Sequence, residues 1–167
     1  MNDRIVVLEV SGLEALHLAG IVGQFRDLVV NADRDDDPAV ARLTPDAYPD
    51  DEDASREFRR LTGADMLDRR ADDAQTVLHT LGMESGELDP TGDPETTITV
   101  ALGEGEARAW MRTLSAVRLV LATRLGIQDD DDHRPGDARF GIYDWIGYRL
   151  DGLVTALDRT LEEPPGH

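Results

Sequence analysis

The stretch EGEARAWMRTLSAVRLVLATRLGI, residues 104–127, decides the fold. Apolar side chains recur in it every three or four residues, which places them on one face of a helix: Ala107, Trp110, Leu114, Val117, Leu121 and Leu125. Met111, Leu119 and Val120 are apolar as well and lie off that face. A helix that is apolar on most sides is buried against several neighbours, so this segment is predicted to be the central helix. Gly126, just past the last periodic residue, is expected to end it.

Arg118 lies in the most apolar part of this helix. Removing the partner of a buried charge costs several kcal/mol, roughly 3–5, so a buried guanidinium needs a carboxylate or a ligand. Asp144 or Asp151 is the expected partner, in a structural ion pair. The alternative is a contact between Arg118 and an anion or another ligand.

Length and composition indicate one soluble domain. The 167 residues suffice for a sizeable core, and no run of 18 apolar residues predicts a membrane span. The N-terminal sequence MNDRIVVLEV lacks the basic and apolar regions of a signal peptide, so a cytoplasmic location is expected. The absence of cysteine excludes disulfides, thiolate metal sites and cysteine catalysis within these residues.

The charge balance is strongly acidic, with 35 acidic against 17 basic residues and a formal net charge of −18. All the basic residues are arginines, and they form no cluster along the chain. Binding to phosphate backbones requires clustered cations, so no direct nucleic-acid contact is expected. An acidic surface favours protein partners instead.

The fold class predicted is mostly α, a single-domain helical bundle with a minor two-stranded β-sheet. The strands are expected at about 4–10 and 96–102, both rich in β-branched residues. Each strand leads into a helix, and the two strand–helix segments align with a shift of 92 positions, with Glu14, Ala15 and Arg26 identical to Glu106, Ala107 and Arg118. This repeat predicts two strand–helix units packed side by side. The domain is expected to span 1–162, with a disordered tail at 163–167.

Further helices are indicated by periodicity and capping residues. Ser11 and Glu14 form a capping box ahead of a helix to about Val30, in which Gly20 and Gly23 predict close approach of a neighbour. Helices are also expected over 50–62 and 64–81, broken or bent at Gly63, and over 140–161. The last helix has a core stripe of Ile142, Ile146, Leu150, Leu153, Leu157 and Leu161.

No motif for chemistry is present. Residues 31–38 resemble the start of a calcium loop, but Pro38 and Thr44 stand where glycine and glutamate are required. The acidic run 128–138 has no regular element to fix its geometry, so neither a metal nor a cofactor is predicted. The sequence holds no HExxH, GxGxxG, P-loop or GxSxG pattern. Trp110, Tyr143 and Trp145 are expected in the core, or alternatively around a pocket between the two C-terminal helices.

Three stretches together resemble a known family: RLTPDAY (42–48) followed by EFRRLT (57–62), then residues 106–127, and YDWIGYRLDGLV (143–154). Their order is similar to an uncharacterised actinobacterial family that is often encoded next to ClpS, the Clp protease adaptor. The matching positions are Arg42, Tyr48, Arg59, Arg118, Arg124, Gly126, Tyr143 and Trp145. The resemblance implies that some members regulate transcription under oxidative stress, through a protein partner and with cysteines as sensors. This chain has no cysteine, so that sensing cannot operate in it.

The leading hypothesis is a regulatory or adaptor protein without enzymatic activity. Its partner would be a protein of transcription or of Clp proteolysis, and the candidate binding residues are Arg42, Tyr48, Arg59, Arg118, Arg124, Tyr143 and Trp145. The alternative is a small-molecule binder or enzyme with a pocket around Arg118, Arg124, Tyr143 and Trp145. Homodimerisation through the last helix is a further hypothesis.

Overall fold

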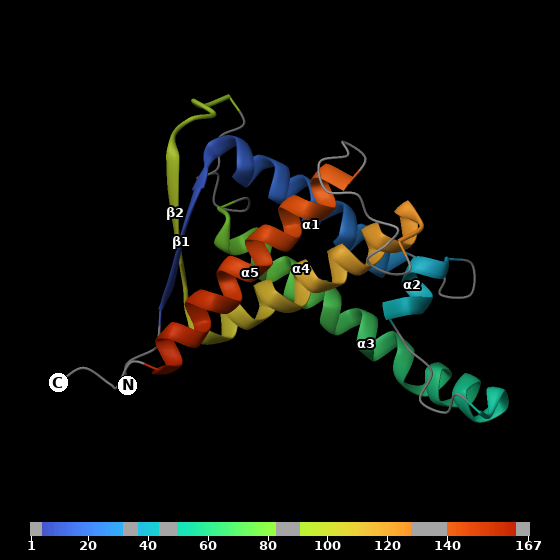
Figure 1. Ribbon diagram of the computed structural model, residues 1–167. Helices are drawn as coiled ribbons and strands as arrows, with labels where there is room; N and C mark the ends of the chain where they lie inside the picture. The colour runs from blue at the N-terminus through green and yellow to red at the C-terminus, as the bar shows by residue number, and fades with distance from the viewer. Residues whose placement is uncertain (1–4, 32–36, 44–49, 83–90, 128–139, 163–167) are drawn as a thin grey trace.

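The computed structural model describes residues 5–31, 37–43, 50–82, 91–127 and 140–162, without the side chains of residues 55, 59 and 161. The elements follow in the order β1 (Val6–Ser11), α1 (Gly12–Asn31), α2 (Pro38–Leu43), α3 (Glu52–Thr80), β2 (Thr97–Leu102), α4 (Glu104–Leu125) and α5 (Gly141–Glu162). The prediction of a mostly helical protein with a small two-stranded sheet is confirmed (Figure 1). The predicted tail at 163–167 lies outside the described residues.

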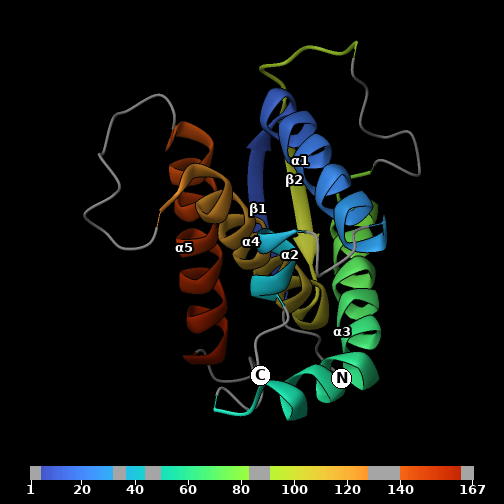
Figure 2. The ribbon, with the colours of Figure 1, turned by 90° about the vertical axis from the view of Figure 1, so that its right-hand side faces the viewer.

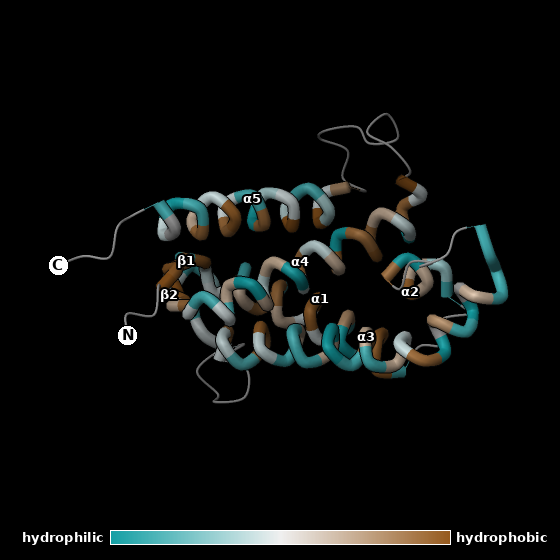
Figure 3. The backbone as a smooth tube through the Cα atoms, turned by 90° about the horizontal axis from the view of Figure 1, so that it is seen from below, coloured by the Kyte–Doolittle hydropathy of each residue, from teal (hydrophilic) through white to brown (hydrophobic). Residues whose placement is uncertain are grey.

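Helix α4 is the centre of the molecule, as its apolar sequence predicts. It packs against α2, α3 and α5, and α5 and α3 lie on opposite sides of it (Figure 3). Trp110, Leu114 and Val117 on its predicted core face are buried. Gly126 ends the helix with a positive φ of 74°, a conformation that glycine adopts without steric cost.

The sheet is antiparallel and pairs Val6 with Leu102, Leu8 with Val100 and Val10 with Ile98. These are the strand positions that align in the sequence repeat, taken in opposite directions. The antiparallel pairing therefore relates the two aligned strands by a local twofold axis at the Leu8–Val100 pair. In each unit the helix begins directly after its strand, and the repeat explains this arrangement (Figure 2).

The first turns of α1 and α4 are stabilised differently. Glu14 N–H donates to Ser11 Oγ at 3.1 Å, which confirms the backbone half of the predicted capping box. In α4, Gly103 N–H donates to Glu106 Oε1 at 2.9 Å. The first turn of α4 is therefore stabilised by the side chain of Glu106, which accepts from the backbone before the helix. In α1 the side chain of Ser11 accepts from the backbone of the first turn.

Glycine has a different role in α1 from the predicted one. Nothing lies within 4 Å of a Cβ built on Gly20 or Gly23, so no neighbouring helix approaches there and the prediction was wrong. The close approach is at Gly12, where a Cβ would lie 3.0 Å from the carbonyl oxygen of Asp93. Gly12 N–H donates to the carbonyl of Thr96 at 2.8 Å, which holds the start of α1 against the segment before β2.

Helix α3 is one helix of 29 residues, where the sequence predicted two helices that meet at Gly63. The helix does not break there, but its first turns run at an angle to the rest (Figure 2). Thr62 Oγ1 donates to the carbonyl of Phe58 at 2.8 Å. Such bonding to the carbonyl four residues earlier often bends helices, and glycine offers no side chain to resist the bend.

Helix α2 was not predicted. Asp37 is its N-cap residue, because its carboxylate accepts from Ala39 N–H at 2.9 Å and its carbonyl accepts from Ala41 N–H at 3.0 Å. Pro38 takes the first helical position, where a missing N–H costs nothing. Asp37 and Pro38, which were predicted to lie in an acidic loop, therefore begin a helix.

Helix α5 is held to β1 and α1 by Arg149, which ion-pairs with Glu14 and donates to the carbonyl of Glu9 at 3.5 Å. Half of its predicted core stripe is confirmed, since Ile146, Leu153 and Leu157 are buried. Leu150 is partly buried, the side chain of Leu161 is outside the described part of the structure, and Ile142 in the first turn is 52% exposed, so its assignment to the core was wrong. None of the helices described is long and apolar enough to cross a membrane.

Candidate functional site

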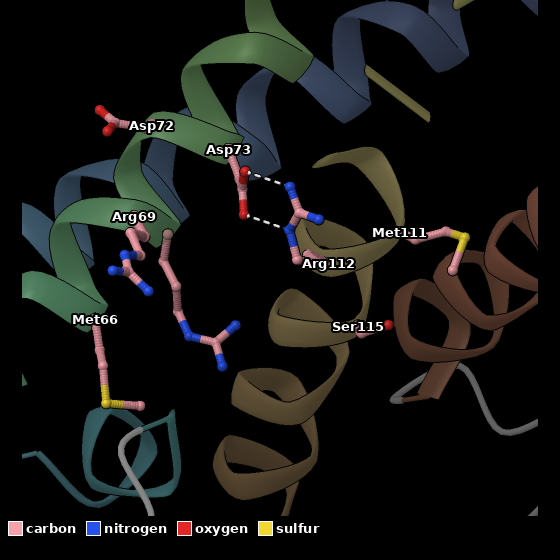
Figure 4. Close-up of a pocket in the computed structure, with 8 residues that line it drawn as sticks. Met66, Arg69, Asp72, Asp73, Met111, Arg112 and Ser115 are labelled. Carbon is pink, nitrogen blue, oxygen red and sulfur yellow. Dashed lines mark hydrogen bonds and ion pairs between the residues drawn. The ribbon is translucent and has the colours of Figure 1, made fainter. Parts of the chain in front are cut away.

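An open cleft of about 800 Å³ lies between α3 and α4 (Figure 4). Its lining is rich in arginine and methionine and includes two aspartates: Met66, Arg69, Arg70, Asp72, Asp73, Met111, Arg112 and Ser115. These residues come from two helices that are far apart in the sequence. The cleft therefore exists only in the folded chain.

Helical spacing explains how α3 contributes to the cleft. Met66, Arg70 and Asp73 follow each other at four and three residues, which places them on one side of the helix. From α4, Arg112 points toward Asp73, whereas Met111 and Ser115 project toward α5 (Figure 4). The surface formed by these residues therefore begins in the groove between α3 and α4 and continues over α4 toward α5.

Asp73 and Arg112 join the two walls of the cleft. Arg112 Nε and Nη2 donate to the two carboxylate oxygens of Asp73 at 2.8 and 2.9 Å. This bidentate pair raises the pKa of Arg112, because the hydrogen bonds to Asp73 stabilise the charged guanidinium. The side chains are 56% and 20% exposed, so water screens the pair and its contribution to stability is modest.

Arg69 and Arg70 carry the remaining positive charge of the cleft. Arg70 is half-buried, and its guanidinium donates to the carbonyl of Leu43 at 3.4 Å, beside the end of α2. Burial lowers the pKa of Arg70, although the nearby charge of Asp73 opposes this shift. Arg69 is exposed. Neither arginine forms an ion pair with a residue that the structure describes.

Among the residues predicted from the sequence, Arg118 and Tyr143 come together. The guanidinium of Arg118 lies over the Tyr143 ring, with Cζ 4.3 Å from the ring centroid. On the same side α5 carries Gly147, and a Cβ there would lie 3.1 Å from Arg118 Nε. Arg118 is thus packed between α4 and α5 against an aromatic ring and a glycine.

The predicted ion pair of Arg118 with Asp144 or Asp151 is wrong. Arg118 forms no ion pair with either, and its buried Nε has no hydrogen-bond partner among the described residues. The ring of Tyr143 takes the place of the carboxylate, because a guanidinium within about 6 Å of an aromatic centroid is attracted by the ring quadrupole. Arg118 is also only partly buried, so its charge keeps some contact with water.

Arg42 and Arg124 lie where α2 meets α4. Arg124 donates to both carboxylate oxygens of Asp37 at 3.0 and 2.7 Å. Arg42 donates to Thr123 Oγ1 at 2.9 Å. Both arginines thus connect α2 to the last turn of α4.

The Asp37–Arg124 pair predicts a measurable pH dependence. The hydrogen bonds from Arg124 hold the pKa of Asp37 below its usual value of 3.8, more strongly than burial raises it. A depressed pKa in the folded state contributes stability above the unfolded pKa, and this contribution is lost as the pH falls through the folded pKa. Replacing Asp37 by asparagine is expected to lower the free energy of unfolding at neutral pH by under about 1 kcal/mol, because Arg124 is half-exposed.

Urea unfolding of the wild type and Asp37→Asn at pH values from neutral to below 4 measures this effect. Asparagine caps a helix as well as aspartate does, so the substitution removes the charge and keeps the cap. The difference between the two proteins should shrink as the pH falls below 4. A constant difference at all pH values would show that the ion pair is not its source.

The remaining predicted residues are separate from these clusters. Trp145 meets the ring of His17 of α1 edge-on, with 6.5 Å between the centroids. Tyr48 lies outside the described residues, as does the side chain of Arg59. Of the candidate residues with described side chains, Arg42, Arg118, Arg124, Tyr143 and Trp145 lie outside the α3–α4 cleft, and their role in binding stays a prediction.

The described ranges hold no group of three or more histidine, aspartate or glutamate side chains that could bind a metal ion. The acidic run at 128–138 lies outside those ranges. The cleft itself was missed by the sequence reasoning. Its available signal was the spacing of Met66, Arg70 and Asp73, which continues toward the buried Val77 on the same face of α3.

Comparison with known proteins identifies the family. The model of a domain of unknown function, DUF2017, matches residues 1–157, so the chain belongs to this family. It is 30% identical over 148 residues to a protein of Mycobacterium leprae that carries the name AosR, covering 78% of this chain and 63% of that protein. It is also 30% identical over 145 residues to the oxidative stress regulator AosR of Mycobacterium tuberculosis, covering 76% of this chain and 61% of the relative. The chain thus spans less than two thirds of the length of these relatives. No solved structure matches it.

Proposed function

We propose that this member of the DUF2017 family is a regulatory protein that acts by binding another protein, and not an enzyme. The observation that carries the proposal is the similarity, over most of the chain, to mycobacterial proteins named oxidative stress regulators. The α3–α4 cleft supports it, because an open groove with arginine and methionine side chains suits a protein segment. Interfaces are enriched in both residue types.

The partner that we propose is a cytoplasmic protein of transcription or of Clp proteolysis. With a net charge of −18, the chain repels nucleic acid at long range, which favours regulation through a protein over direct contact with DNA. The chain contains no cysteine, so any response to oxidants would have to come from the partner or from another chemistry.

Affinity capture tests this proposal. The tagged chain is incubated with lysate of the source cell at low and high salt, and bound proteins are identified by mass spectrometry. We expect one protein in stoichiometric amount that is lost at high salt, because charged contacts between exposed groups are screened. An unrelated acidic protein on the same resin is the control for binding by charge alone.

The captured protein must then be purified and recombined with the chain. Light scattering of the mixture should give the mass of a defined complex, and the chain by itself shows whether it forms a homodimer. Failure of any purified candidate to form a complex, or the absence of capture at both salt concentrations, would overturn the proposal.

A further inference from the structure

We propose that the α3–α4 cleft binds a short amphipathic segment of a protein partner, with carboxylates on one side and apolar side chains on the other. This inference rests on the proposed function and specifies the chemistry of the partner. It assigns the contacts with carboxylates to Arg69 and Arg70, and the contacts with apolar side chains to Met66 in the groove and to Met111 where the segment passes over α4.

The charge of the cleft is the first argument. The chain carries about two acidic residues for each arginine, 35 against 17. Nevertheless Arg69 and Arg70 stand next to each other on α3 without an ion pair to a described residue, at the wall of an open cleft. Arg70 is half-buried, so its guanidinium has lost part of its hydration and gains from an incoming carboxylate.

The second argument is that Asp73 already neutralises the charge of Arg112. Asp73 already occupies two donors of Arg112, with distances of 2.8 and 2.9 Å. Positive charge is therefore available mainly at the α3 wall. A ligand with one or two carboxylates fits this distribution.

The methionines are the third argument. Met66 and Met111 are only partly buried. Met66 lies on the α3 side of the groove with Arg69 and Arg70, whereas Met111 lies where the lined surface continues over α4 toward α5 (Figure 4). Unbranched, polarizable methionine side chains adapt to apolar groups of different shapes and are common on surfaces that bind peptides. They would cover the apolar side of an amphipathic segment, as in the binding of a helix in a groove.

The aspartates of the cleft argue against phosphate-rich ligands. Asp72 and Asp73 line the same cleft, and Figure 4 shows Asp73 reaching from α3 to Arg112 of α4. A nucleic acid presents a dense row of phosphates to such carboxylates and to a chain of net charge −18. A peptide can place its few carboxylates at Arg69 and Arg70 alone.

Fluorescence anisotropy with a designed peptide tests the inference. The probe is a fluorescein-labelled peptide that alternates pairs of glutamate with pairs of leucine, and its binding to the full chain is measured at low salt. The overall field of the chain repels this probe, so binding would require a local site. We expect saturable binding that weakens at high salt, and about tenfold or more weaker binding by the double variant Arg69→Gln with Arg70→Gln, because charged hydrogen bonds are lost.

Arg56→Gln with Arg60→Gln is the matched control. It removes the same two positive charges from the same helix, at residues that are exposed and do not line the cleft. We expect less than a twofold effect there. A peptide with glutamine in place of glutamate, and one with alanine in place of leucine, should each bind more weakly than the probe.

Several results would overturn the inference. They are no binding of the probe by the wild type, equal weakening by the control with Arg56→Gln and Arg60→Gln, or unchanged binding by the variant with Arg69→Gln and Arg70→Gln. If Arg70→Gln impairs folding, as seen by circular dichroism, Arg69→Glu provides the test, since Arg69 is exposed. A captured partner that binds the Arg69 variant as tightly as the wild type would refute the cleft but leave the regulatory proposal intact.

Discussion

Replacing Trp110 by alanine is expected to lower the free energy of unfolding by about 3–5 kcal/mol. Trp110 is 2% exposed and lies on the face of α4 that the sequence marks as core. Its indole Nε1–H donates to Thr80 Oγ1 at 2.7 Å, and Thr80 in turn donates to the carbonyl of Val77 at 2.9 Å. The substitution therefore removes a large buried side chain and one end of a partly buried hydrogen-bond chain. Urea unfolding at neutral pH measures the loss.

Two further variants separate packing from hydrogen bonding. Thr80→Val keeps the shape of the side chain but leaves the Trp110 N–H without its acceptor, so a loss of about 1–3 kcal/mol is expected. Trp145→Ala is the comparison at a partly buried tryptophan, where a smaller loss is expected. Equal losses at Trp110 and Trp145 would contradict the central position of α4 in the core.

Replacing Gly147 by alanine is expected to destabilise the protein by about 1–3 kcal/mol, the usual cost of overpacking. The new methyl group would lie 3.1 Å from Arg118 Nε and 3.4 Å from its Cζ. Arg118 would have to shift by a few tenths of an ångström between the new methyl group and the Tyr143 ring, which strains the cation–π contact. Thermal and urea unfolding of the purified variant measure the effect.

Gly152→Ala is the matched control, because it lies on the same helix with nothing within 4 Å of its Cβ. Alanine in an exposed helix position is expected to stabilise by about 0.5–1 kcal/mol. The cost at Gly147 should also shrink when Arg118 is replaced by alanine, since the two side chains then no longer collide. Additive effects of Gly147→Ala and Arg118→Ala would show that the two residues do not share this contact.

Local patterns predicted the regular elements well. The apolar periodicity of α4, the β-branched residues of both strands and the glycine at the end of α4 each act within a few neighbouring residues. The repeat added tertiary information, because its two strands pair about the Leu8–Val100 position. These features depend on spacing and backbone preference, which the sequence contains.

The errors have local causes too. Helix α2 is short and its Asp37-Pro38 start was taken for part of an acidic loop, although aspartate before proline is a typical helix beginning. Gly63 was expected to break or bend the chain between two helices, but α3 continues through it as one helix because a single glycine costs only about 1 kcal/mol relative to alanine. The longer helix outweighs that cost through its packing on α1 and α4.

The contacts of the arginines could not be predicted from the sequence. Arg118 was assigned a carboxylate because its neighbours are apolar, but the crossing of α4 and α5 brings Tyr143 to it instead. Arg69 and Arg70 resemble ordinary solvated residues of a polar helix until α4 packs beside them. The packing of the whole core determines which helices cross and which of their residues meet at the crossing. The spacing of residues within one helix does not determine this.

The pairing of β1 with β2 has a consequence for how the chain folds. The strands are separated in the sequence by α1, α2 and α3, so a growing chain on the ribosome contains β1 long before β2 exists. Closing so long a loop costs entropy and slows folding, whereas α1 and α3 can pack as soon as both are made. Until β2 arrives, the edge of β1 that it will cover is open to pairing with other chains. Synthesis of β2 therefore closes the interval in which the nascent protein is most exposed to aggregation.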